Sequence, residues 1–167
     1  FKDEEKSQEK NYVKEVQIDT DFEILLPDNY INIVNERLIL YNKLSAIKDE
    51  DTLVKFQKNM EDRFGKIPAE GEELLSTLRL KWLASKMGLE RLIIKNKKCV
   101  GYFLSDQQSD FYQSPLFNQI LVGVQKPPNK YSIKEKQTRN GLRLLLVLDQ
   151  VHTVEKLLEQ LNNLVGS

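Results

Sequence analysis

The stretch from Asn140 to Leu148 constrains the fold more than any other part of the sequence. Asn140-Gly141 is the strongest short signal for a β-hairpin, because both residue types tolerate a positive φ. The run Leu142–Leu148 that follows is apolar on both of its faces, which is typical of a central strand. Such a strand needs neighbouring strands at its sides and helices over its apolar faces. The stretch therefore predicts a sheet with helices packed on it.

The rest of the sequence predicts the further strands and the helices of this fold, in the following order. Short extended segments are expected around Val13–Ile18 and Phe22–Leu26, and a second hairpin is expected around Asn96-Lys97. Helical spacing of apolar residues predicts five helices: one from Pro27-Asp28 through Ile31, Val34, Leu38, Tyr41 and Leu44; one from Asp49 to Gly65 through Leu53, Phe56, Met60 and Phe64; one from Pro68 to near Gly88 through Leu74, Leu75, Leu78 and Trp82 or Leu83; one through Leu116–Val124; and one through Val154–Leu164. The predicted fold is α+β, with a mixed or largely antiparallel sheet and the order β-ααα-ββ-α-ββ-α.

Length and composition indicate a single domain that needs no disulfide or bound metal to be stable. A chain of 167 residues suits a single domain, and we assign residues 12–167 to it and the charged, nearly apolar-free residues 1–11 to a linker. Because the chain starts at Phe1, we expect it to be excised from a longer protein. Its single cysteine, Cys99, excludes an internal disulfide and fits a reducing compartment. No signal peptide and no membrane-length apolar run occurs, so we predict a cytoplasmic protein without membrane contact.

The residues that most often carry chemistry are scarce. Nucleotide-binding glycine motifs and a nucleophile elbow are absent, and only seven glycines occur. The only histidine, His152, has no serine or cysteine nucleophile beside it in the sequence, and we interpret it as a residue at a helix start. Cys99 falls inside a β-run, where a small buried side chain is the simpler interpretation. The sequence therefore predicts no enzyme, no cofactor and no metal site in this region.

Two kinds of charged cluster leave alternatives open. Three groups of acids could bind magnesium or act as an acid–base pair, but two of them begin predicted helices, where acids are stabilising. They are Asp19-Asp21-Glu23, Asp49-Glu50-Asp51 and Glu70-Glu72-Glu73. Basic residues gather on the hairpin 130–143, namely Lys130, Lys134, Lys136, Arg139 and Arg143. Such a hairpin could contact a phosphate backbone, although 25 basic and 25 acidic residues give the chain no net charge.

Asp62 is the most informative single residue. It precedes the predicted end of its helix by two residues, where the helix dipole disfavours a negative charge. Lys58 lies four residues earlier, but that order of charges is the weaker orientation for a helical ion pair. Arg63, through the following loop, is the other local partner that the sequence leaves open. An acid placed against its local preference indicates a partner elsewhere.

Asp62 also begins a series of motifs that resembles a known family. Asp62-Arg63-Phe64-Gly65, followed by Ile67-Pro68, begins 31 residues after the end of Leu25-Leu26-Pro27-Asp28-x-Tyr30-Ile31. Asn35-Glu36-Arg37-Leu38-x-x-Tyr41 lies between these motifs, and Leu74-Leu75, Leu80-Lys81 and Gly88 follow them. The series resembles the C-terminal domain of bacterial transcription-repair coupling factor, densely over residues 23–95 and more loosely beyond.

The resemblance implies a regulatory interaction domain. In that family the parent protein is an ATP-driven DNA translocase that displaces stalled RNA polymerase and recruits the A component of the excision-repair machinery. Its C-terminal domain packs on the N-terminal module of the same chain and covers the recruiting surface until polymerase is engaged. The parent's motor lobes, rather than this region, contact the DNA.

The resemblance further implies an interdomain contact through Asn59, Asp62 and Arg63. Asp62 matches a family acid that faces basic residues of the N-terminal module. Asn59 stands where a second acid is often found, and Asn32-Ile33 replaces a common proline–acid pair, so the sequence departs from the pattern there.

Overall fold

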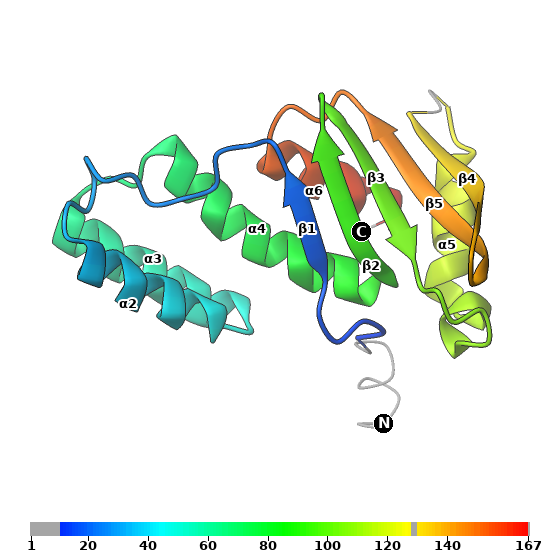
Figure 1. Ribbon diagram of the computed structural model, residues 1–167, viewed down its shortest axis with the longest axis horizontal. Coiled ribbons are helices and arrows are strands. Elements are labelled where there is room, and N and C mark those ends of the chain that lie inside the picture. Colours follow the sequence, from blue (N-terminus) through cyan, green and yellow to red (C-terminus); the bar gives the residue numbers. More distant parts are fainter. Residues whose placement is uncertain (1–10, 128–129, 167) are drawn as a thin grey trace. The chain divides into compact units, whose positions relative to one another are not determined.

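The computed structural model describes residues 11–127 and 130–166, and these form two compact units (Figure 1). The sheet unit contains the described residues up to Phe22 and those from Leu80 onward, and the helical unit contains Glu23–Arg79. Helix α4 (Ala69–Lys86) begins in the helical unit and ends in the sheet unit. Residues 1–10, most of the predicted linker, lie outside the described residues, and the single domain over 12–167 stays a prediction.

The sheet has five strands and mixed direction, which confirms the predicted α+β class. The strands are β1 (Gln17–Thr20), β2 (Leu89–Lys95), β3 (Lys98–Phe103), β4 (Tyr131–Thr138) and β5 (Gly141–Asp149). Their order is β1-β2-β3-β5-β4, with β1 parallel to β2 and every other pair antiparallel (Figure 1). Strand β5 lies inside the sheet, as its two apolar faces predicted.

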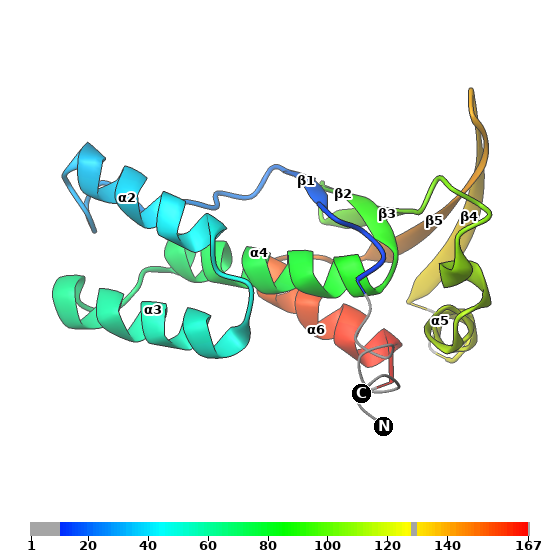
Figure 2. The ribbon, with the colours of Figure 1, turned by 90° about the horizontal axis from the view of Figure 1, so that it is seen from below.

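Helices cover one face of this sheet. Figure 2 shows α5 (Pro115–Val124), α6 (Val154–Leu164) and the last turns of α4 on the same side of the strands. The register aligns Ile94, Cys99 and Leu148 across three strands, and each side chain is at most 1% exposed. Because side chains alternate along a strand, their neighbours Ile93 and Val100 fall on the other face, where they are half-buried.

Both predicted hairpins form, with different turn chemistry. Asn96 and Lys97 have φ values of 54° and 61°, as a two-residue turn of this kind requires. In the second hairpin Thr138 pairs with Gly141, and Gly141 alone of the Asn-Gly pair has a positive φ, at 109°. The turn is therefore centred one residue earlier than the sequence predicted.

The helical unit consists of α2 (Val34–Ser45), α3 (Glu50–Phe64) and the first part of α4. Its core is built from apolar residues of all three helices and of the loops between them. The buried side chains are Leu26, Ile31, Leu40, Leu44, Ile47, Leu53, Met60, Ile67 and Leu75. Leu40 and Leu44 lie four residues apart in α2, and Leu53 and Met60 lie seven apart in α3, so each pair shares one face of its helix. The stripe predicted for α2 was wrong in part, because Val34 and Leu38 are 58% and 53% exposed and Leu40 is buried instead.

Three details of the prediction were wrong. Phe22–Leu26 forms no strand. The first helix begins at Val34, because the Pro27 carbonyl accepts hydrogen bonds from the amides of Tyr30 and Ile31 and closes a separate turn there. In α4 the fully buried residues include Leu80, whereas Leu74, Leu78, Trp82 and Leu83 are only half-buried.

Candidate interaction site on helix α3

Helix α3 has a capping residue at its start and a glycine at its end, and these fix where the helix begins and ends along the sequence. The Asp49 carboxylate accepts a hydrogen bond from the Thr52 amide at 2.8 Å and caps the first turn. This backbone hydrogen bond, and a second from the Thr52 hydroxyl, lower the pKa of Asp49. Gly65, with φ at 88°, ends the helix.

The Asp-Arg-Phe-Gly motif is held by contacts within the helical unit. The Tyr30 hydroxyl donates a hydrogen bond to the Gly65 carbonyl at 2.7 Å, and its ring meets Phe64 edge-on with the centroids 6.0 Å apart. The Arg63 guanidinium lies 4.6 Å from the centre of the Phe64 ring. Burial, followed by the charges of Glu61 and Glu72, raises the pKa of Tyr30, so its hydroxyl remains a donor at neutral pH.

Asp62 is the member of this motif that has no such contact. Its side chain is exposed and makes no hydrogen bond or ion pair with any residue that the structure describes. The i, i+4 pair with Lys58 that the sequence offered is not formed. Arg63 turns instead to Glu36, at 3.9 Å, in an exposed pair that contributes little stability.

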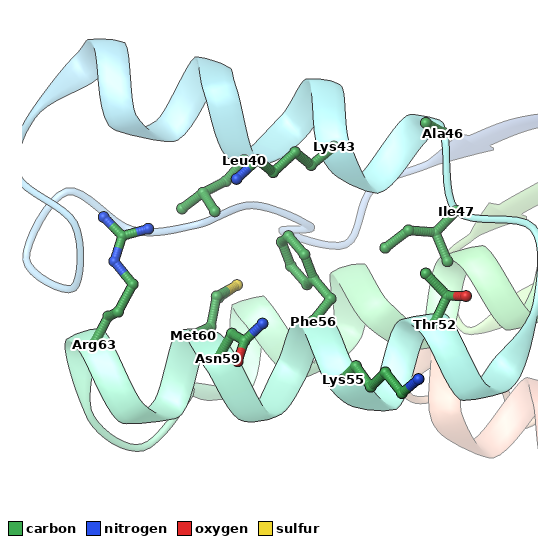
Figure 3. Close-up of a pocket in the computed structure, with 10 residues that line it drawn as sticks. All are labelled: Leu40, Lys43, Ala46, Ile47, Thr52, Lys55, Phe56, Asn59, Met60 and Arg63. Atoms are coloured by element: carbon green, nitrogen blue, oxygen red, sulfur yellow. The ribbon is translucent and has the colours of Figure 1, made fainter.

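A groove of about 420 Å³ lies between α2 and α3 (Figure 3). Its apolar lining comes from both helices and from the loop that joins them: Leu40, Ala46, Ile47, Phe56 and Met60. In Figure 3, Phe56 and Met60 point from α3 into the space below α2, and Arg63 reaches toward α2. Phe56, which the helical spacing suggested for the core, is half-buried because it faces this groove.

The structure divides the three predicted contact residues between two surfaces. Asn59 and Arg63 line the groove, whereas Asp62 lies on the neighbouring exposed surface of α3 and does not line it. Lys43 and Lys55 also line the groove and were missed. Lys55 has a sequence signal, because it lies one turn before Asn59 and two turns before Arg63 on the same helical face. Lys43 comes from a different helix, and only the packing of the helical unit reveals its position.

The basic hairpin of the sheet unit is only partly available for contacts. The pairing of Lys136 with Arg143 places them on one face, together with Lys134, and Arg139 lies in the turn. Arg143 is engaged within the unit, because it pairs with Glu90 at 3.1 Å, donates to the Phe103 carbonyl at 2.8 Å and lies over the Tyr102 ring. Lys134, Lys136 and Arg139 are exposed. Nucleic-acid contact through this hairpin stays a prediction.

The other titratable candidates do not converge on one place. His152 is exposed, whereas Cys99 is fully buried. No group of three or more histidine, cysteine or acidic residues among the described residues could hold a metal ion. The same part of the chain contains no helix that is both long and apolar enough to span a membrane.

Cys99 is expected to resist alkylation in the folded protein. Burial raises the pKa of its thiol to about 12, and the thiolate is the reactive form. With iodoacetamide at pH 8.5 we expect labelling at least about a hundredfold slower in buffer than in 8 M urea, followed by mass spectrometry. Equal rates in the two solutions would contradict the buried position.

Comparison with known proteins supports the family that the motifs indicated. The family model described as the TRCF domain matches residues 20–114. The transcription-repair-coupling factor of Escherichia coli K12 is 33% identical over 110 residues, which are 65% of this chain and 9% of that protein. That of Staphylococcus epidermidis is 29% identical over 160 residues, which are 86% of this chain and 14% of that protein. The chain thus spans a small part of these relatives.

A solved structure has the same fold. The crystal structure of the C-terminal domain of a transcription-repair coupling factor aligns with a TM-score of 0.62, covering 90% of this chain and 94% of that one. At 19% sequence identity the likeness concerns the fold alone.

Proposed function

This chain belongs to the TRCF domain family, and from that membership we propose that it is an autoinhibitory interaction domain of an ATP-dependent DNA translocase. The parent protein couples transcription to nucleotide excision repair in the bacterial cytoplasm. Its C-terminal domain packs on the N-terminal module of the same chain and masks the surface that recruits the A component of the excision-repair machinery. RNA polymerase, once engaged, releases this contact, and the motor lobes of the parent contact the DNA.

The observation that supports this proposal is the free carboxylate of Asp62. A negative charge in the last turn of a helix is unfavourable. The basic residue of that turn, Arg63, pairs with Glu36 rather than with Asp62. The neighbouring residues are firmly placed, because Tyr30 holds Phe64 and Gly65. An exposed, unpaired acid next to these residues is suited to a cation of another module.

The mechanism is a shift between two populations. The contact of Asp62 with a basic side chain favours a closed state, and polymerase binding favours the open one. A charge-assisted hydrogen bond that is shielded from water contributes about 1.5–3 kcal/mol. Its loss is therefore expected to change the ratio of closed to open molecules by roughly 10-fold to 150-fold.

The test is the substitution Asp62→Asn in the full-length protein. We expect a higher rate of ATP hydrolysis without polymerase, and tighter binding to the A component of the excision-repair machinery, because the closed state loses its charge-assisted contact. Both are measured on the same preparation, by a coupled ATPase assay and by pull-down or calorimetry.

Glu61→Gln is the matched control. Glu61 is also exposed and adjacent in the sequence, but it faces a different side of α3, where it accepts a hydrogen bond from Gln57 at 3.2 Å. The control should leave both measurements near those of the parent protein. If folded Asp62→Asn protein also leaves both unchanged, Asp62 has no part in the mechanism.

A further inference from the structure

We propose that the groove between α2 and α3 is a docking site for an acidic, amphipathic peptide segment of a partner protein. This proposal goes beyond the contact made by Asp62, because Asp62 does not line the groove. It concerns a second surface of the same helix, with the opposite charge.

The floor of the groove is apolar and incompletely filled by the helical unit. Leu40 and Met60 are buried beneath it, but the Phe56 ring is half-buried and Ala46 is exposed. The volume of about 420 Å³ lies within the range of sites that accept large side chains. Figure 3 shows the space bounded by two helices, which is the geometry that receives the apolar face of a third helix.

The rim of the groove carries positive charge only. Lys43 on α2 and Lys55 and Arg63 on α3 line it, and no carboxylate does so among the described lining residues. Lys43 and Lys55 form no ion pair within the described chain, and the Arg63–Glu36 pair is long, at 3.9 Å. An occupant with carboxylates at its edges would therefore gain electrostatic complementarity on both walls.

These two properties together select the kind of partner. A nucleic acid would satisfy the cations but would leave the apolar floor without a counterpart, because phosphate contacts dominate its binding. A neutral apolar ligand would fill the floor but would leave the ammonium groups of Lys43 and Lys55 beside it without an ion pair. A helix with large apolar residues on one face and glutamates along its edges satisfies both.

Binding of a labelled probe peptide to the 167-residue chain tests the proposal. The probe is an amphipathic peptide of about 15 residues with leucines at positions i, i+4 and i+7, glutamates beside them at the edges of the apolar face and alanines elsewhere, and a second peptide replaces each glutamate with lysine. Fluorescence anisotropy at physiological salt should show at least about tenfold tighter binding of the acidic peptide. Equal affinities for the two peptides would overturn the proposal.

Matched variants locate the binding site. Lys55→Glu should weaken binding of the acidic peptide by about tenfold, whereas Lys58→Glu, an exposed lysine of the same helix outside the groove, should change it by less than about twofold. Ala46→Phe should block binding by filling the groove, and its exposed position leaves the buried core unchanged. Equal losses in the two lysine variants would place the contact elsewhere and overturn the proposal.

The oligomeric state separates a peptide from a second copy of the chain. Sedimentation of the chain at rising concentration should show a monomer. If the chain instead dimerises, and Ala46→Phe abolishes the dimer while neither peptide binds, the occupant is a second copy and the proposal fails. None of these results depends on the ATPase rate of the full-length protein, so the Asp62 mechanism is tested separately.

Discussion

Replacing Gly88 with alanine is expected to destabilise the sheet unit by about 2–5 kcal/mol. Gly88 has a φ of 70°, where a residue with a Cβ atom carries about 1–2 kcal/mol of strain. A Cβ atom at this position would also lie only 2.6 Å and 2.7 Å from two carbons of the Phe111 ring. Overpacking of this kind costs about 1–3 kcal/mol in addition. Urea denaturation measures the total.

The Phe111 ring cannot easily move away from the added atom. It is fully buried and contacts Tyr12, Phe103 and Phe117, with ring centroids 5.0 Å, 6.0 Å and 5.2 Å away. Gly141→Ala is the control, because Gly141 also has a positive φ but has no atom within 4 Å of an added Cβ. The control should show the backbone cost alone. Equal losses in the two variants would show that the contact with Phe111 is unimportant.

Leu53→Ala is expected to lower the free energy of unfolding of the helical unit by about 2–5 kcal/mol. Leu53 is fully buried on the side of α3 that packs into its own unit, so the truncation leaves a cavity. Val54, the next residue, is 48% exposed, and Val54→Ala should cost less than about 1 kcal/mol. Both variants are measured by urea denaturation, with the slope m as a check that the same surface is exposed on unfolding.

A difference of less than about 1 kcal/mol between these two variants would contradict the assigned orientation of α3. That orientation matters for both proposed surfaces. With Leu53 and Met60 turned into the unit, Phe56 and Asn59 face the groove and Asp62 faces away from it. A rotated helix would exchange these positions.

Local signals made most of the element order predictable. The Asp49 cap and the Gly65 end of α3 involve residues close together in the chain, and so does the turn at Asn96-Lys97. The strand predicted at Phe22–Leu26 does not form, because this segment is a loop that packs against the helical unit. Leu26 is 2% exposed, and its amide donates a hydrogen bond to the Tyr41 hydroxyl at 2.9 Å. A periodic pattern cannot distinguish such a loop from a short strand.

The candidate site was predictable only in part, for the same reason. Asp62 could be singled out because the helix dipole acts along the helix that contains it. Its lack of a partner could not, since the sequence also offered Lys58. The groove was not predictable, because its walls join Lys43 and Leu40 of one helix to Phe56 and Met60 of another.

The sequence by itself determined the α+β class, the presence of two hairpins, the two ends of α3 and the family, since these depend on residues within a few positions of one another or on motifs at fixed spacing. The tertiary structure alone decided that β1 pairs parallel to β2, that Phe56 faces a groove, and that Asp62 remains unpaired while Arg63 turns to Glu36. These features depend on which surfaces meet when distant segments pack. The packing arrangement depends on how all the apolar side chains are buried together, so it cannot be predicted from a local sequence pattern.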